Sequence, residues 1–235
     1  MARKRGSLAR EEREQQILRE AARIFATKGY HAASVTEIVE SSGVARGTFY
    51  NYFDSKEDVF LKLVNSYFEQ LTDILERNSA RLREAVLGGG RPLEAWLQNA
   101  LDYLRFHRDN PHLTSIIYRL AMGRDNAFSQ KVENQAVFAR KKMAESLDML
   151  LERGMIIPCD TELAATFIAG SSVGLILSRL LWDEDRDLTR LAFELVRNQS
   201  RAMATSQMGI DRFLKAMERE LFAAGTGAKE SAGEG

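Results

Sequence analysis

The sequence is poor in the residues from which most catalytic, metal and disulfide sites are built. Its 235 residues include one cysteine, three histidines and three prolines. The single cysteine, Cys159, cannot form a disulfide within the chain, which fits a reducing cytoplasm. The histidines show no metal-ligand spacing such as H-E-x-x-H, and no phosphate-binding P-loop occurs. We therefore expect no catalytic residue, no metal and no cofactor.

Long apolar runs and net charge are absent as well. The longest stretch without a charged residue, 163–178, is shorter than the ~20 residues that a membrane helix needs. The N-terminus is charged and lacks the apolar core of a signal peptide. The 33 basic residues balance 33 acidic ones, so the whole chain has no electrostatic preference for one kind of partner. We expect a cytoplasmic protein without a membrane partner.

Nearly every segment has the apolar periodicity of an α-helix, and no run alternates in the manner of a strand. The three prolines, Pro92, Pro111 and Pro158, are expected at helix starts, where proline is tolerated. We predict an all-α fold with helices at about 8–28, 34–42, 45–53, 55–87, 92–108, 111–122, 126–153 and 160–182, and one or two more within 188–223. Residues 225–235 are too poor in apolar side chains to fold and should form a disordered tail.

The most informative segment is residues 34–56, SVTEIVESSGVARGTFYNYFDSK. Ser34 and Glu37 have the spacing of a capping box, which starts a helix. Gly43 should end that helix, because glycine tolerates the left-handed conformation of a tight turn. A second short helix follows, with Phe49 and Phe53 facing inward at i, i+4. Two short helices joined in this way indicate a helix-turn-helix motif, whose second helix enters the DNA major groove.

These residues resemble a known family. The stretch G-V-A-R-G-T-F-Y-N-Y-F-D-S-K-E, residues 43–57, is similar to the recognition segment of TetR-type transcriptional regulators. Residues 13–30, R-x-x-I-L-x-x-A-x-x-x-F-x-x-x-G-Y, resemble the first helix of that family. The resemblance covers roughly residues 10–70. It implies a DNA-binding domain over 8–56 (about 11–71 in the family) and a helical ligand-binding and dimerisation domain over 57–224.

The outer face of the second short helix carries side chains suited to DNA. Arginine can bind guanine edges or phosphates, threonine and asparagine can hydrogen-bond bases or phosphates, and tyrosine hydroxyls reach phosphates. A glycine lets the backbone approach the duplex. The positions that match the family's contacts are Arg46, Gly47, Thr48, Tyr50, Tyr52 and Lys56, with Thr36 in the preceding helix; Asn51 stands where the family varies and is expected to contribute to operator choice.

A basic cluster precedes the first predicted helix. Arg3, Lys4 and Arg5 stand near the N-terminus with no acidic neighbour among the first ten residues. Such an arm suits phosphate or minor-groove contacts beside a helix-turn-helix. The alternative is a solvated tail without a role in binding.

The C-terminal half is rich in large apolar groups, which the family resemblance links to a small-molecule effector and the periodicity links to an ordinary bundle core. The candidate effector-binding residues are Trp96, Tyr103, His107, Tyr118, Phe138, Phe167 and Ser171. The segment 163–181 is apolar nearly all round, so a second subunit should cover one side of it. Gly170, Gly174 and Leu175 are the candidate dimer contacts.

Together these patterns suggest a ligand-responsive transcriptional regulator, most simply a repressor. It would bind a palindromic double-stranded DNA operator as a homodimer and be released by a small, mostly apolar effector. The rival hypothesis is a helical ligand-binding or adaptor protein that does not bind DNA. A chain of that kind would need neither the exposed Arg46–Tyr50–Asn51 face nor the basic arm.

Overall fold

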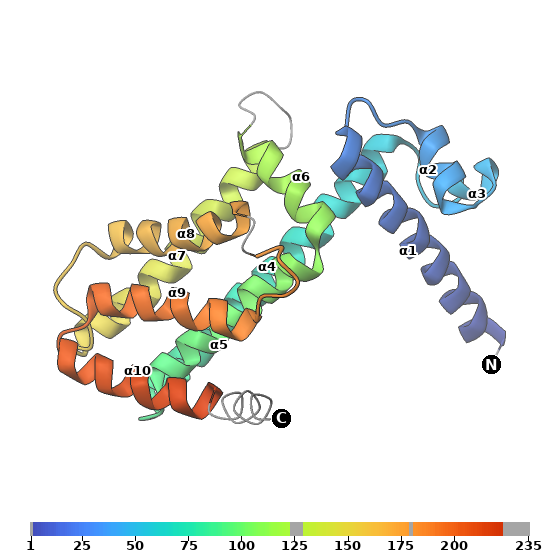
Figure 1. Ribbon diagram of the computed structural model, residues 1–235. Coiled ribbons are helices and arrows are strands. Elements are labelled where there is room, and N and C mark those ends of the chain that lie inside the picture. Colours follow the sequence, from blue (N-terminus) through green and yellow to red (C-terminus); the bar gives the residue numbers. More distant parts are fainter. Residues whose placement is uncertain (1, 123–128, 179–180, 223–235) are drawn as a thin grey trace, which may run out of the picture. The chain divides into compact units, whose positions relative to one another are not determined.

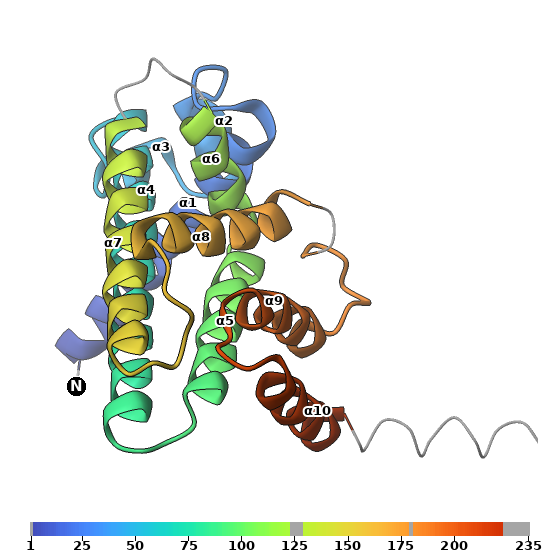
Figure 2. The same ribbon diagram turned by 90° about the vertical axis from the view of Figure 1, so that its left-hand side faces the viewer.

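The computed structural model describes residues 2–122, 129–178 and 181–222, and for 2–9 and 120–122 it describes the backbone alone. Within these ranges the regular structure is helical, apart from one isolated bridge between Ile156 and Ala204 (Figures 1 and 2). The helices are α1 (Ala2–Lys28), α2 (Val35–Ser42), α3 (Arg46–Tyr50), α4 (Lys56–Leu87), α5 (Pro92–Asp109), α6 (Pro111–Met122), α7 (Ser129–Glu152), α8 (Thr161–Leu177), α9 (Leu188–Met203) and α10 (Gln207–Phe222). The all-α prediction is confirmed, and no helix in the described ranges is long and apolar enough to cross a membrane.

Local signals in the sequence account for most helix ends. The Ser34 hydroxyl accepts a hydrogen bond from the Glu37 N–H, and the Glu37 carboxylate accepts one from the Ser34 N–H, which completes the capping box. Gly43 ends α2 with φ 64°, in the left-handed region. Pro92 and Pro111 are the first residues of α5 and α6. Ser55 caps the start of α4, because its hydroxyl accepts a hydrogen bond from the Asp58 N–H at 3.1 Å.

Some expected boundaries were wrong. Helix α1 begins at Ala2 rather than near residue 8, and α3 ends at Tyr50 rather than continuing to Phe53. Helix α8 ends at Leu177 instead of residue 182, and the Trp182 indole N–H donates to the Ile176 carbonyl at 2.8 Å. The chain therefore turns back over the last turn of α8. Pro158 precedes α8 without belonging to it, since Asp160 is the N-cap. The predicted tail, 225–235, lies outside the described residues.

The chain separates into two compact units that do not follow the expected division at residue 56. Unit 1 comprises Met1–Asp73 and Asp109–Ala136, and unit 2 comprises Ile74–Arg108 and Val137–Gly235. Helix α4 runs through both. Its first part completes the core of unit 1, where the Phe60 ring lies edge-on to Phe25 at 5.3 Å. Helix α6 also belongs to this unit, because the hydroxyl groups of Tyr67 and Thr114 are hydrogen-bonded at 3.2 Å.

The core of unit 2 is formed by several helices of the C-terminal half. A cluster of buried residues joins α4, α5, α7, α8 and α9, and the partly buried Trp96 packs against it. Its members are Leu82, Val86, Ala95, Ala144, Leu147, Leu150, Ile156, Ala165, Ile168 and Met203. Helices α9 and α10 lie side by side in both ribbon views. The apolar stripes predicted for this half are thus largely core.

Candidate DNA-binding surface and effector cavity

In unit 1, α2 and α3 form a helix-turn-helix supported by α1. Helix α3 has only five residues, so it depends on tertiary contacts for its stability. Phe49 and Phe53 supply these contacts, since both are buried and their ring centroids are 5.8 Å apart. Ile38 of α2 is fully buried as well. The inward face predicted from the i, i+4 phenylalanines is confirmed.

The opposite face of α3 is accessible. Arg46, Gly47 and Asn51 are exposed, and Tyr50 retains 45% of its surface. The Tyr50 ring lies edge-on to Phe49 at 5.3 Å, and the Arg46 guanidinium is 6.0 Å from the Tyr50 ring centroid. The tyrosine is therefore anchored at its base while its outer surface and the adjacent cation remain free to meet a partner.

Gly47 lies in the middle of this face, and the protein's own packing does not require it. A Cβ atom added there would meet no atom within 4 Å, and the residue does not have positive φ. The glycine therefore leaves open space on the outside of α3. Such space suits a close approach of the helix backbone to a macromolecular partner.

The remaining candidates on this side are less exposed or are tied to other elements. Thr36 is exposed, whereas Thr48 and Tyr52 are half-buried. The Arg10 guanidinium of α1 lies 5.7 Å from the Tyr52 ring centroid. The stacking links α1 to the residues just after α3 and orients the Tyr52 ring.

Lys56, which is predicted to contact a phosphate, is hydrogen-bonded within the chain. Its ammonium donates hydrogen bonds to the Tyr30 and Ala33 carbonyls at 2.8 Å each and lies 3.3 Å from the His31 carbonyl oxygen. It also lies 4.6 Å from the Tyr30 ring centroid. An ammonium group has three N–H donors, and these carbonyls can engage all of them. The structure therefore makes Lys56 a tether for the loop between α1 and α2.

The structure corrects the expected conformation of the basic arm. Residues Arg3, Lys4 and Arg5 belong to the first turns of α1 rather than to an extended segment before it. Their side chains lie outside the described residues. Their contact with DNA stays a prediction.

Charges at the start of α2 are fixed by short-range hydrogen bonds. The Glu37 carboxylate accepts from the Lys28 ammonium and from the hydroxyl and N–H groups of Ser34. These contacts, with Lys28 the largest cause, lower the pKa of Glu37 to about 2. In the same region, hydrogen bonds from the Ser41 hydroxyl and from Arg23 lower the pKa of Glu20. These ionised carboxylates hold α1 and α2 together beside the exposed face.

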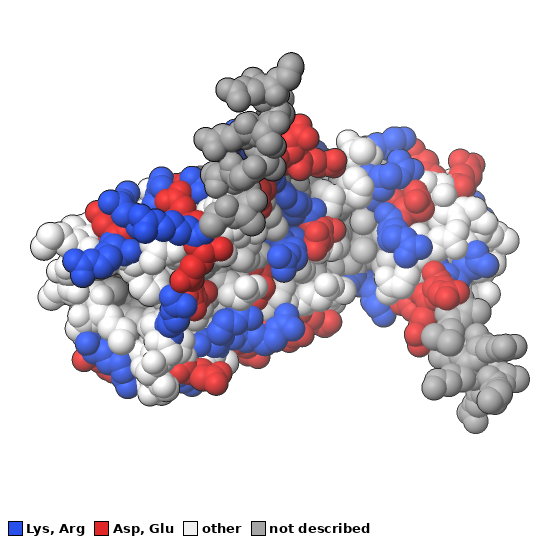
Figure 3. All heavy atoms as spheres, turned by 60° about the horizontal axis from the view of Figure 1, so that its bottom comes forward, with Lys and Arg blue, Asp and Glu red and all other residues white. Residues whose placement is uncertain are grey.

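Acidic and basic residues are intermixed over the face of the molecule seen in Figure 3, and the chain as a whole has no net charge. Binding to a polyanion would therefore depend on local groups such as Arg46 rather than on the overall field.

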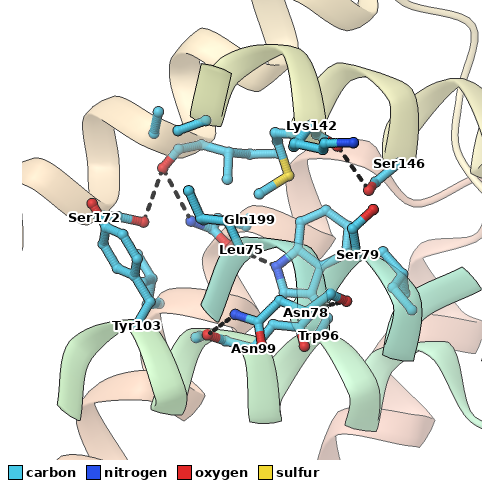
Figure 4. A pocket seen from close by; sticks show the side chains of 17 residues that line it. Leu75, Asn78, Ser79, Trp96, Asn99, Tyr103, Lys142, Ser146, Ser172 and Gln199 are labelled. Atoms are coloured by element: carbon cyan, nitrogen blue, oxygen red, sulfur yellow. Dashed lines mark hydrogen bonds between the residues drawn. The ribbon is translucent and has the colours of Figure 1, made fainter. Parts of the chain in front are cut away.

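Unit 2 contains a cavity of about 120 Å³ with mostly apolar walls (Figure 4). Helices α4, α5, α7, α8 and α9 contribute its lining. The residues are Leu75, Asn78, Ser79, Leu82, Trp96, Asn99, Ala100, Tyr103, Ala139, Lys142, Met143, Ser146, Ile168, Ala169, Ser172, Leu195 and Gln199.

The polar groups of the wall are largely paired with one another. The Trp96 indole N–H donates to the Gln199 side-chain oxygen at 3.0 Å, and the Gln199 amide donates to the Ser171 hydroxyl at 2.9 Å. The Asn78 and Asn99 amides donate to each other's backbone carbonyls at 3.2 and 3.0 Å. Because these groups already have partners, the interior favours an apolar occupant.

Two of the seven predicted effector residues, Trp96 and Tyr103, line this cavity. Ser171 stands behind Gln199, and the buried His107 lies behind Tyr103 with ring centroids 4.6 Å apart. The other three predicted residues do not line this cavity. Tyr118 belongs to unit 1, Phe138 lies beside Lys142 outside the lining, and Phe167 is 62% exposed.

Gln199, Asn78 and Asn99 are cavity residues that the sequence interpretation missed. Gln199 is 3% exposed and occupies the same face of α9 as Ala192, Val196 and Met203. A glutamine among the apolar residues of a buried helix face is the sequence signal that could have identified Gln199 as a cavity residue. Burial of a side-chain amide is favourable only with hydrogen-bond partners, which Trp96 and Ser171 supply here.

The predicted dimer contacts lie on or beside an exposed stripe of α8. Leu163, Phe167, Gly170, Gly174 and Leu177 recur at alternating spacings of four and three residues, and all are exposed. Within this chain, the three large apolar side chains are 56–69% exposed. Leu175 is half-buried and does not belong to the stripe, and its dimer contact stays a prediction.

Comparison with known proteins agrees with the helix-turn-helix. The model of the family described as "Bacterial regulatory proteins, tetR family" matches residues 17–63. The chain is 41% identical over 59 residues to the uncharacterized HTH-type transcriptional regulator YuxN of Bacillus subtilis, covering 25% of this chain and 20% of YuxN. It is 26% identical over 140 residues to the HTH-type transcriptional repressor AcnR of Corynebacterium diphtheriae, covering 59% of this chain and 73% of AcnR.

Among solved structures, the fatty acid degradation regulator FadR of Bacillus halodurans is similar with a TM-score of 0.63 and 25% identity, covering 80% of this chain and 94% of FadR. FadR of Bacillus subtilis, solved in complex with stearoyl-CoA, has a TM-score of 0.59 and 23% identity, covering 79% of this chain and 97% of that one. The latter similarity concerns the fold alone.

The supported α2–α3 motif with its exposed face defines a helix-turn-helix transcriptional regulator. More particularly, residues 17–63 are a DNA-binding domain of the tetR family of bacterial regulatory proteins. The family resemblance of residues 13–30 and 43–57 is confirmed. This family consists of transcriptional regulators and not of enzymes.

Proposed function

We propose that this protein is a ligand-responsive repressor that binds a palindromic operator as a homodimer and is released by a small, mostly apolar effector. The observation that carries the proposal is the exposed face of α3, where Arg46 and Tyr50 surround the open space at Gly47. In helix-turn-helix proteins the second helix lies in the DNA major groove, so this face would contact the bases. An adaptor protein without DNA binding would have no use for such a surface.

The exposed stripe of α8 supports the homodimer. Its large apolar side chains would be covered in a two-fold interface, where the same stripe on both subunits is self-complementary. Gly170 and Gly174 would let two such helices approach closely. Two helix-turn-helix motifs related by this symmetry would bind half-sites about 34–36 Å apart, or a multiple of this distance.

The cavity of unit 2 supports regulation by an effector. Apolar walls with a few polar groups are typical of small-molecule sites. The effector would act by binding more tightly to a conformation in which the recognition helices no longer fit the operator spacing. A complete reversal of occupancy needs about 5.5 kcal/mol of such preference. By linkage, operator DNA must weaken effector binding by the same factor.

Fluorescence anisotropy with DNA from upstream of the protein's own gene tests the DNA-binding part of the proposal. We expect specific binding, and Arg46→Ala and Tyr50→Ala should each weaken it by about 1–3 kcal/mol without altering the helical content. A matched control is Arg77→Ala on α4, which is also exposed and lies in unit 2. Equal affinity of all three variants and the parent would refute the assigned face. A reporter gene then distinguishes repression from activation.

A further inference from the structure

The cavity of unit 2 borders a second hollow of different chemistry. The second hollow, a groove of about 240 Å³ between α4 and the end of α7, is lined by Ser79, Arg83, Leu87, Glu145, Ser146, Met149, Glu152 and Arg153. Ser79 and Ser146 line both hollows. The cavity and the groove therefore adjoin each other at these two residues, one from α4 and the other from α7.

The junction is suited to the passage of a narrow group. Serine is among the smallest side chains, and the Ser146 hydroxyl is already turned back onto its own helix, where it donates to the Lys142 carbonyl at 2.9 Å. Figure 4 shows Ser79 and Ser146 at the same side of the cavity, away from Tyr103 and Ser172. A hydrocarbon chain could cross here without leaving a polar group newly unpaired.

The two hollows differ in the partners that their walls offer. Inside the cavity, Trp96, Gln199 and the two asparagines are hydrogen-bonded to other protein groups, so the wall offers little to a polar ligand. The outer groove carries Arg83 and Arg153, both exposed and neither in an ion pair within 4 Å among the described residues. Arginine is well suited to bind carboxylate and phosphate oxygens.

The acidic residues of the groove do not cancel this preference. The Glu145 carboxylate lies 3.5 Å from the Lys142 ammonium, so its charge is already balanced. Glu152 is then the one acidic residue of the lining left to offset the charges of the two arginines. The groove therefore has a net excess of one positive charge once the Lys142–Glu145 pair is set aside.

We propose that the effector is an amphipathic anion, whose alkyl chain fills the cavity and whose anionic head lies in the groove between Arg83 and Arg153. The cavity volume of about 120 Å³ is similar to that of an engineered apolar cavity of about 150 Å³ that binds benzene, which has six carbons. The chain enters between Ser79 and Ser146. This inference rests on the proposed function, because it specifies the chemical class of the effector.

Isothermal titration calorimetry of the full-length protein, without DNA, tests the proposal with four probes of equal chain length. These are octanoate, octyl phosphate, 1-octanol and octylammonium. We expect both anions to bind roughly tenfold more tightly than 1-octanol, because the anionic head forms an ion pair with each arginine and the alcohol does not. The ratio of octanoate to octyl phosphate distinguishes a carboxylate head from a phosphate head.

The arginines are tested by substitution. Arg83→Gln with Arg153→Gln should reduce the affinity for octanoate to that for 1-octanol and leave 1-octanol binding unchanged. Arg83→Lys with Arg153→Lys should retain most of the preference, and Arg77→Gln, in the same helix but outside both hollows, should retain all of it. Ser79→Phe should block all probes while circular dichroism stays unchanged.

Several results would overturn the proposal. They are an absence of binding by every probe, equal affinity for octanoate and 1-octanol, tightest binding of octylammonium, and an anion preference that persists in the glutamine variants. Because the titrations contain no DNA, these failures would leave the proposed repressor function intact. Conversely, arginine-dependent octanoate binding that leaves the operator complex undisturbed would contradict the effector role but keep the ligand class.

Discussion

Two glycines four residues apart in the helix-turn-helix should respond in opposite ways to the same substitution. Gly43 has φ 64°, where a side chain is strained. Gly43→Ala should therefore lower the free energy of unfolding by about 1–2 kcal/mol. Gly47 has neither positive φ nor an atom within 4 Å of an added Cβ, and it lies in a helix. Gly47→Ala should raise stability by about 0.4–1 kcal/mol, because alanine reduces the entropy of the unfolded chain.

The operator affinities should follow the opposite order. In Gly47→Ala the new methyl group occupies the space through which the α3 backbone would approach DNA, so binding should weaken although the fold is stabilised. In Gly43→Ala the fraction that remains folded should bind nearly as the parent does.

Urea unfolding followed by circular dichroism and anisotropy titration with operator DNA measure the two quantities on the same samples. A Gly47→Ala protein that is destabilised would refute the claim that there is free space for a methyl group at this position. One that is stabilised and still binds DNA as tightly as the parent would remove Gly47 from the interface.

Three further predictions concern other parts of the structure. Lys56→Met should lower stability by about 1–3 kcal/mol in urea unfolding, because it leaves the loop carbonyls of the α1–α2 connection without their donor; unchanged stability with weaker DNA binding would restore the phosphate contact. Burial lowers the pKa of His107 from 6.5 to about 3, so below pH 6.5 the unfolded state binds a proton that the folded state rejects. Stability should then fall with decreasing pH by up to ~1.4 kcal/mol per unit until about pH 3, and His107→Gln should remove this contribution; parallel pH profiles of the two proteins would contradict it. Gly174→Trp should shift the protein toward monomer in sedimentation velocity, while Arg77→Trp, at an exposed position of α4 outside the stripe of α8, should leave the dimer intact; a fully dimeric Gly174→Trp protein would exclude the stripe from the interface.

The sequence by itself determined the helix-turn-helix, because the forces that define it act over a few residues. The capping box joins Ser34 to Glu37, the left-handed turn needs only Gly43, and the two inward phenylalanines are one helical turn apart. The same locality explains why the exposed face of α3 could be predicted. Once Phe49 and Phe53 are fixed inward, the helical period places Gly47 and Asn51 outward.

Only the tertiary structure decided where side chains distant in sequence meet. Lys56 reaches the Tyr30 carbonyl 26 residues earlier, Arg119 donates to the Ala26 carbonyl across 93 residues, and Trp96 meets Gln199 across 103. These pairs attach Lys56 to the loop between α1 and α2, place α6 with the N-terminal helices, and complete the wall of the cavity. Helical periodicity tells which face of a helix is buried, but it does not tell which other helix covers that face. Membership of a cavity or of a compact unit therefore had to come from the packed structure.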